Sequence, residues 1–168
     1  LGEFVAVVAN NWWRAKEALR EVAIDWETGD NSQLTSAVIM NSFKAGMGQA
    51  ELAVARNDGN TVQALGTAAK VLEAEYFTPY LAHATMEPMV CTAWLQGDKL
   101  DVWTSTQNPE NTLAVAAATA GVAQDKVTVH PMQLGGGLGR KSPQDFTRQG
   151  VMIAKAMAGT PVKMVWSR

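Results

Sequence analysis

Four glycines in five positions, Gly135, Gly136, Gly137 and Gly139, restrict the fold of this chain more than any other feature. Glycine loses more backbone freedom on folding than any other residue, so such a run is disfavoured inside helices and strands. We therefore expect a loop. The entropy that these glycines lose on folding must be offset by a favourable contact. That contact is either close packing of the backbone within the protein or close approach of the backbone to a ligand.

The segments around this loop alternate between strand and helix patterns. Apolar and alternating runs predict strands at 71–78, 90–95, 100–104, 126–130 and 162–166. Gln96-Gly-Asp98 is typical of a hairpin turn between two of them. Asn108 is a good N-cap for a helix that Gly121 ends, and Ser142 is expected to cap a second helix that Gly159 ends. This order predicts the α+β class, a mixed sheet with packed helices.

The first third of the chain is less clearly patterned. Apolar runs predict strands at 4–8 and 22–26, and Asn10 or Asn11 is expected to cap a helix that continues to about Leu19. Residues 27–36 are polar and are expected to form a loop, whereas 37–52 are ambiguous because Gly46 and Gly48 weaken a helix. A short helix is expected at 61–69.

Composition excludes several classes of protein. Of 168 residues, 47% are hydrophobic and 18% are charged, which is too apolar for a disordered chain. A net charge of −2 gives no overall basic surface for nucleic acid, and no apolar run is long enough for a membrane span. Cys91 is the only cysteine, so the chain alone cannot hold an iron–sulfur cluster. Because neither end resembles a natural terminus, we expect a fragment of a larger protein.

The glycine run indicates an anion site. Glycines let backbone N–H groups approach a ligand, and Arg140 and Lys141 follow just before the expected helix N-terminus. Two common phosphate motifs do not fit. The dinucleotide-binding motif Gly-x-Gly-x-x-Gly does not match, because the position after Gly139 is Arg140. The Gly-Lys-Ser end of a P-loop does not match either, because Arg140 is inserted between Gly139 and Lys141. A turn that only lets a helix and a strand pack remains an equal alternative.

Four other residues have side chains suited to chemistry. Gln107 lies between a strand end and a helix cap, where its N–H could donate to an oxo ligand while its carbonyl accepts a hydrogen bond; a solvated loop glutamine is the simpler alternative. His83 and Glu87 could orient a ligand or transfer a proton, but we favour the reading that both satisfy buried backbone groups. Cys91 is expected to be a small core residue.

Taken together, these residues resemble the molybdenum hydroxylases of the xanthine oxidase family. The motifs that carry the resemblance are Pro79-Tyr-Leu-Ala-His-Ala-Thr-Met-Glu-Pro88, Ser105-Thr-Gln-Asn-Pro109, Leu134-Gly-Gly-Gly-Leu-Gly-Arg140 and Pro161-Val-Lys-Met-Val-Trp-Ser-Arg168. The large (beta) subunit of the isoquinoline 1-oxidoreductase type is the nearest match. Residues 1–69 are similar to the family's α/β hammerhead segment, and 70–168 to the first part of its molybdopterin-binding domain.

The resemblance implies a function and a set of cofactor contacts. Family members hydroxylate an aldehyde or N-heteroaromatic carbon with water as the oxygen source, at a molybdenum held by molybdopterin, which in bacteria usually carries a cytosine dinucleotide. Gln107 falls where a glutamine hydrogen-bonds the molybdenum oxo group. The loop residues that fall against the cofactor are Gly136, Gly137, Leu138, Gly139 and Arg140. Implied partners are the rest of the large subunit and a small [2Fe-2S] subunit, with no nucleic acid.

The sequence departs from the family pattern in three ways. The family commonly has phenylalanine at Leu138, and its purine-specific members have glutamate at Ser142. The catalytic glutamate of the family lies beyond Arg168, so no catalytic residue is expected within this chain, and the isolated chain is expected to be inactive. A non-catalytic phosphate- or nucleotide-binding module that uses residues 135–140, and an independently stable structural domain, are the competing hypotheses.

Overall fold

The computed structural model describes residues 4–48 and 53–168, which divide into two compact units. The first unit comprises the chain up to Val22 together with Tyr80–Arg168, and the second comprises Ala23–Pro79. The first unit contains all the strands of the described residues and the glycine loop, so it holds the candidate site.

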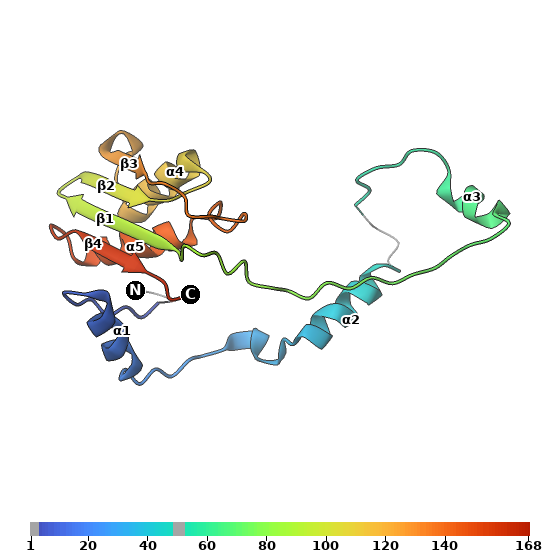
Figure 1. Ribbon diagram of the computed structural model, residues 1–168, viewed down its shortest axis with the longest axis horizontal. Helices are drawn as coiled ribbons and strands as arrows, with labels where there is room; N and C mark the ends of the chain where they lie inside the picture. Colours follow the sequence, from blue (N-terminus) through green and yellow to red (C-terminus); the bar gives the residue numbers. More distant parts are fainter. Residues whose placement is uncertain (1–3, 49–52) are drawn as a thin grey trace. The chain divides into compact units, whose positions relative to one another are not determined.

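The first unit is built on a four-stranded mixed sheet in the order β3-β2-β1-β4 (Figure 1). The strands are β1 (Val90–Gln96), β2 (Lys99–Thr104), β3 (Val127–Pro131) and β4 (Val162–Val165). β1 pairs antiparallel with β2 and with β4, whereas β2 and β3 are parallel. The hairpin turn lies between Gln96 and Lys99, where Gly97 has a φ of 62°. The predicted mixed sheet and hairpin are thus confirmed.

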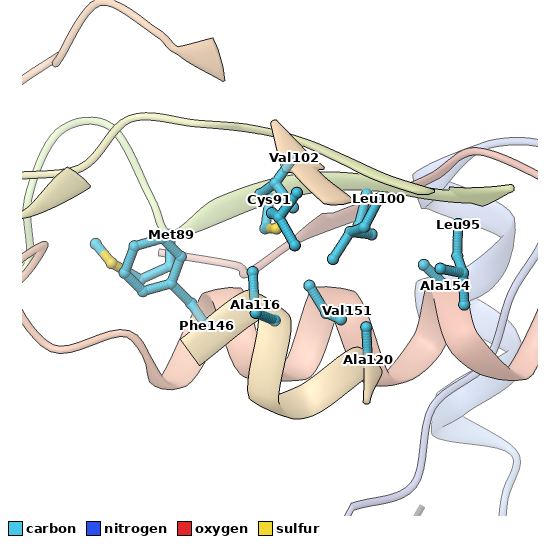
Figure 2. Packing of buried hydrophobic residues seen from close by; sticks show 13 residues of the cluster. Met89, Cys91, Leu95, Leu100, Val102, Ala116, Ala120, Phe146, Val151 and Ala154 are labelled. Atoms are coloured by element: carbon cyan, nitrogen blue, oxygen red, sulfur yellow. The ribbon is translucent and has the colours of Figure 1, made fainter. Parts of the chain in front are cut away.

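Helices α4 (Pro109–Ala120) and α5 (Asp145–Ala156) cover one face of this sheet (Figure 2). The Asn108 side chain accepts the amide of Asn111, and Gly121 ends α4 with a φ of 79°, as predicted. The buried residues of α4 are mostly alanines, which let the helix approach its neighbours closely. The cluster between the layers contains Met89, Cys91, Ala93, Leu95, Leu100, Val102, Ala116, Ala117, Ala120, Val127, Phe146, Val151 and Ala154.

Helix α5 begins two residues later than expected. Ser142 does not cap it but lies in a turn, in which its amide donates to the carbonyl of Gly139 and its carbonyl accepts the Gln144 side chain. Gln144 is the N-cap position, and its side chain accepts no capping hydrogen bond. A short irregular segment therefore separates the glycine loop from the helix, and the expected direct run from loop to helix N-terminus is wrong.

Helix α1 (Trp12–Arg20) also belongs to the first unit, and the Asn11 side chain caps it as predicted. The strands expected at 4–8, 22–26 and 71–78 do not form in the described part of the chain. These runs have the right residue types, but a strand also needs a neighbour for its backbone hydrogen bonds, and no described strand pairs with them.

The second unit is mainly irregular. It contains the 3-10 helix η1 (Gly29–Gln33), α2 (Ser36–Gly46) and α3 (Thr61–Thr67). Helix α2 begins at Ser36, the last residue of the expected loop, and covers the first part of the ambiguous stretch 37–52, of which residues 49–52 lie outside the described residues. Neither α2 nor α3 has a buried residue, and large apolar side chains such as Leu72 are exposed.

Close packing between α5 and β1 depends on Gly150. A Cβ at this position would lie 2.7 Å from the Cys91 Sγ and 2.9 Å from its Cβ. Both residues are in the core, and the Cys91 side chain is fully buried, as expected for a small core residue. Gly150 thus sets the distance between the helix and the sheet that carry the site.

We predict that Gly150→Ala destabilises the protein by about 1–3 kcal/mol, because the added methyl group overpacks the core. Urea denaturation measures the change. Gly66→Ala is the matched control, since no atom lies within 4 Å of its added Cβ. Cys91→Ala should restore part of the loss in the double variant by removing the nearer atom, and equal stability of Gly150→Ala and the parent would contradict this account.

Candidate functional site

The parallel pairing of β2 and β3 brings the predicted site residues together. Thr104, the last residue of β2, lies opposite Pro131, the last residue of β3. Because the carboxyl ends of parallel strands meet at one edge of a sheet, the segments that follow them emerge side by side. Gln107 follows β2, and the glycine loop follows β3.

The glycine loop has an unusual backbone. Gly136 and Gly139 have φ values of 88° and 89°, and Leu138 between them has a φ of 51° although it is not a glycine. A leucine in this left-handed conformation costs about 1 kcal/mol or more. Its side chain is 75% exposed, so packing of that side chain does not offset the cost. Strain of this kind is typical of functional loops.

Four consecutive amides of this loop have no acceptor. Within the described residues, the N–H groups of Gly136, Gly137, Leu138 and Gly139 donate no hydrogen bond. The flanking amides are all used, since those of Gly135, Arg140 and Lys141 donate to Glu87, Gly137 and Gln107. We refer to residues 136–139 as the amide row. It is a concentrated set of neutral donors.

Gln107 lies directly against the amide row. Its main-chain N–H donates to the carbonyl of Lys141 at 3.1 Å, and its side-chain Oε1 accepts the Lys141 amide at 3.2 Å. A Cβ at Gly137 would collide with this Oε1, so only glycine permits the contact. The amide oxygen of Gln107 is therefore occupied, as predicted. Its Nε2 group has no acceptor among the described residues and is left to donate.

An ion pair between the buried Lys141 and the half-buried Glu87 lies beneath the loop. The Lys141 Nζ is 2.5 Å from Glu87 Oε2 and donates to Ser105 Oγ at 2.9 Å, and the side chain of Lys141 has no exposed surface. Glu87 Oε1 accepts the Ser105 hydroxyl at 2.7 Å, and Oε2 accepts the Gly135 amide at 2.6 Å. Burial raises the pKa of Glu87, but hydrogen bonds from Lys141, Ser105 and Gly135 outweigh it and lower the pKa overall.

This ion pair corrects one expectation and confirms another. Lys141 does not stand at the surface to attract an anion, because it is buried and paired with Glu87. Glu87 accepts a backbone amide of an irregular segment, as we favoured, although the amide belongs to the exposed Gly135 and not to a buried residue. His83 does not share that role, since it is exposed and its Nε2 lies 4.0 Å from where a Cβ of Gly139 would be.

Arg140 is also paired. Its guanidinium donates to both carboxylate oxygens of Asp145, at 2.9 Å and 2.6 Å, and lies 5.3 Å from the ring centre of Trp166. The Arg140 hydrogen bond lowers the pKa of Asp145. Arg140 is thus next to the amide row with its charge compensated, and its contact with a cofactor stays a prediction.

Gln144 is a central residue that the sequence analysis missed. It is 4% exposed, and its Oε1 accepts the hydroxyls of Thr112 and Thr147 at 2.8 Å and 2.9 Å. Its Nε2 donates to the carbonyls of Lys141 and Ser142. It joins the starts of α4 and α5 to the end of the glycine loop. No sequence pattern separates such a glutamine from a solvated one.

Two cavities of the first unit are not lined by the amide row. One of about 930 Å³ lies between the segment 4–19 and the α5–β4 region, and its lining is mostly apolar. A smaller one of about 160 Å³ is lined by His83, Arg140 and Arg168, among others. Neither includes Gln107 or Gly135–Gly139. The donor chemistry, and not cavity size, therefore identifies the candidate site.

Residues 4–48 and 53–168 contain no group of three or more His, Cys, Asp and Glu side chains that could hold a metal ion. Among the helices of these residues, none has both the length and the apolar character needed to cross a membrane.

We predict that Glu87→Gln lowers the free energy of unfolding by about 2–3 kcal/mol at neutral pH, the range for a hydrogen bond to a charged group. Because the pKa of Glu87 is lower in the folded protein, its contribution is full above about pH 5 and is lost as the pH falls below about 4. Denaturation at several pH values measures this. Glu110→Gln, at the exposed start of α4, is the control, and a pH-independent difference would contradict the prediction.

We predict that Gly137→Ala accelerates hydrogen exchange at the Lys141 amide by about tenfold, because the methyl group displaces the Gln107 oxygen that protects it. Gln107→Ala should give a similar increase, since it removes the same acceptor. Gly66→Ala should leave this amide unchanged. Hydrogen exchange measured by NMR tests the hydrogen bond from the Lys141 amide to Gln107 Oε1. Exchange rates equal to that of the parent in all three variants would show that this hydrogen bond does not form.

Comparison with curated proteins finds relatives along the whole chain. The membrane-bound aldehyde dehydrogenase [pyrroloquinoline-quinone] of Gluconacetobacter polyoxogenes is 25% identical over 98% of this chain and 22% of that protein. The xanthine dehydrogenase molybdenum-binding subunit of Escherichia coli is 26% identical over 99% of this chain and 23% of that protein. The aldehyde oxidoreductase molybdenum-binding subunit PaoC of Escherichia coli is 34% identical over 64% of this chain and 14% of that protein.

The chain thus spans less than a quarter of the length of these relatives. The family model described as the molybdopterin cofactor-binding domain matches residues 46–168, well over half of the chain. The matched range contains Gln107, the amide row and the Glu87–Lys141 pair. The chain belongs to the molybdopterin cofactor-binding domain family, and its relatives place it with the xanthine oxidase family that its motifs resemble.

Proposed function

We propose that this chain binds molybdopterin through the amide row and Gln107, as part of the large subunit of a molybdenum-dependent oxidoreductase. The single observation that carries the proposal is the amide row itself, four adjacent N–H donors without acceptors next to a glutamine whose amide oxygen is already occupied. Such a set of fixed donors matches a ligand made of acceptor oxygens.

The residues present fit an anionic cofactor. The amides of Gly136, Gly137, Leu138 and Gly139 would face its oxygen atoms, and the Nε2 of Gln107 would donate to an oxo group. The two carboxylates beside the donors are compensated, because Glu87 is paired with Lys141 and Asp145 is paired with Arg140. Arg140 completes the proposed set. When bound, the molybdenum supplies the redox chemistry, while the protein binds and orients the group.

The finer assignments are part of the same proposal. The motif resemblance favours an enzyme of the isoquinoline 1-oxidoreductase or aldehyde dehydrogenase type that hydroxylates a carbon with water as the oxygen source, and favours the cytosine dinucleotide form of the cofactor. It also favours residues 1–69 as a hammerhead-like segment that precedes the cofactor domain at 70–168. The rest of the large subunit and a small [2Fe-2S] subunit are the proposed partners, without which the chain is inactive.

We predict that the protein, purified with its partner subunits from a host that makes molybdopterin, contains molybdenum and pterin, and that Gly136→Ala lowers both at least threefold. The added methyl group enters open space beside the amide row. Gly159→Ala is a matched control, because Gly159 has a φ of 87° against 88° for Gly136 and also has no close neighbour. Both variants carry a similar backbone strain of about 1 kcal/mol, so only cofactor binding separates them.

Metal analysis and pterin fluorescence give the readout. Absence of molybdenum and pterin from an active preparation would overturn the proposal, as would equal losses in the two variants. Saturable binding of nucleotides by protein without molybdopterin would instead favour the alternative, a non-catalytic phosphate- or nucleotide-binding module that uses residues 135–140.

A further inference from the structure

We propose that Lys141 is a positioning residue. Its ion pair with Glu87 closes the glycine loop, and its main chain orients the Gln107 side-chain amide toward the cofactor. The inference rests on the proposed function, because the group that the oriented Gln107 amide would bind is the cofactor. It adds a role for two residues that contribute no donor to the amide row.

One carboxylate oxygen binds both ends of the loop. Glu87 Oε2 accepts the amide of Gly135 at 2.6 Å and lies 2.5 Å from the Nζ of Lys141. These two residues flank the amide row. A Cβ at Gly135 would also lie 2.8 Å from the Cβ of Glu87, so the loop sits directly on this side chain. The ion pair therefore acts as a clasp that limits how far the loop can open.

Lys141 transmits this constraint to Gln107. Its side chain binds Glu87, and its main-chain N–H and C=O groups bind the Oε1 and the N–H of Gln107. Among the described residues, Lys141 alone hydrogen-bonds both the carboxylate and the glutamine. If the Lys141 side chain lost its ion pair with Glu87, the Lys141 main chain, which orients the Gln107 amide, would be less firmly held in place.

Stability alone does not account for this pair. Lys141 is completely buried, and removing an ammonium group from water is expensive. Replacing a buried ion pair by apolar residues of similar size is often neutral or stabilising, so such a pair is weak evidence for a purely stabilising role. Here the pair holds the two ends of a strained loop together, which an apolar contact cannot do with the same directionality.

The pair also controls charge at the site. The Glu87 carboxylate receives the amide next to the amide row, where an unpaired negative charge would repel an anionic cofactor. The Glu87 carboxylate is paired with the Lys141 ammonium and accepts the Ser105 hydroxyl, which in turn accepts a hydrogen bond from Lys141. The charge of Glu87 is thus compensated by a cation that does not lie among the free amides. The same clasp thus provides geometry and neutrality.

The test is a double-mutant cycle between Lys141→Met and Gln107→Ala in the holoenzyme with its partner subunits. The readout is the rate at which pterin is released, measured by fluorescence after rapid filtration. We expect Lys141→Met to speed release about tenfold when Gln107 is present, the equivalent of one hydrogen bond. In the Gln107→Ala background we expect less than about a threefold increase, because the residue through which Lys141 acts is gone.

Thr147→Val is the matched control. Thr147 is fully buried and donates to Gln144 in the same polar network, but it touches neither Glu87 nor Gln107. Its effect on release should be the same factor in both backgrounds. If Lys141→Met also gives equal factors in both, Lys141 only stabilises the fold and the proposal is wrong.

A second variant keeps the test decisive if Lys141→Met does not fold. Ser105→Ala removes the hydroxyl that donates to Glu87 and accepts a hydrogen bond from Lys141, but it leaves the ion pair. It should therefore speed pterin release less than Lys141→Met does, with the same dependence on Gln107. If the parent protein contains no pterin, the proposed function fails. Hydrogen exchange at the backbone amide of residue 141 then decides the positioning role, which is wrong if neither variant accelerates this exchange.

Discussion

The candidate site depends on the carboxylate of Glu87. This one group accepts hydrogen bonds from the Ser105 hydroxyl in the segment after β2, and from the Gly135 amide and the Lys141 ammonium at the two ends of the glycine loop. Together these donors outweigh desolvation and lower its pKa, which shows that the folded protein is arranged around the charged form. This carboxylate ties both ends of the glycine loop to Ser105 in the segment that follows β2, beside the hydrogen bonds that join Lys141 to Gln107.

The sheet topology makes that arrangement possible. β2 and β3 are parallel neighbours that end at the same edge, and Gln107 and the glycine loop continue from their two ends. The helices α4 and α5 brace this edge from one face, and Gly150 allows α5 to lie in direct contact with β1. A well-packed scaffold thus supports a strained loop, an arrangement typical of binding sites.

Local signals predicted most of the elements around the site. The hairpin at Gly97, the capped helix α4 and the four strands of the sheet follow from turn, capping and alternation patterns that act over a few residues. The strands expected at 4–8 and 71–78 were wrong, because a strand depends on a partner that local patterns do not specify. The predicted start of α5 was wrong because Ser142 lies in a turn and the N-cap position is Gln144.

The amino-acid sequence by itself determined the glycine loop, the place of Gln107 between a strand and a capped helix, and the family, since these depend on residue types and their order. Only the tertiary structure decided what the charged residues near the loop do. Lys141 and Arg140 look alike in the sequence, yet one is buried against Glu87 and the other binds Asp145. The physical reason is that the partner of a charge is set by contacts between residues distant in the chain, such as Glu87 and Lys141, and these contacts exist only once the sheet has formed.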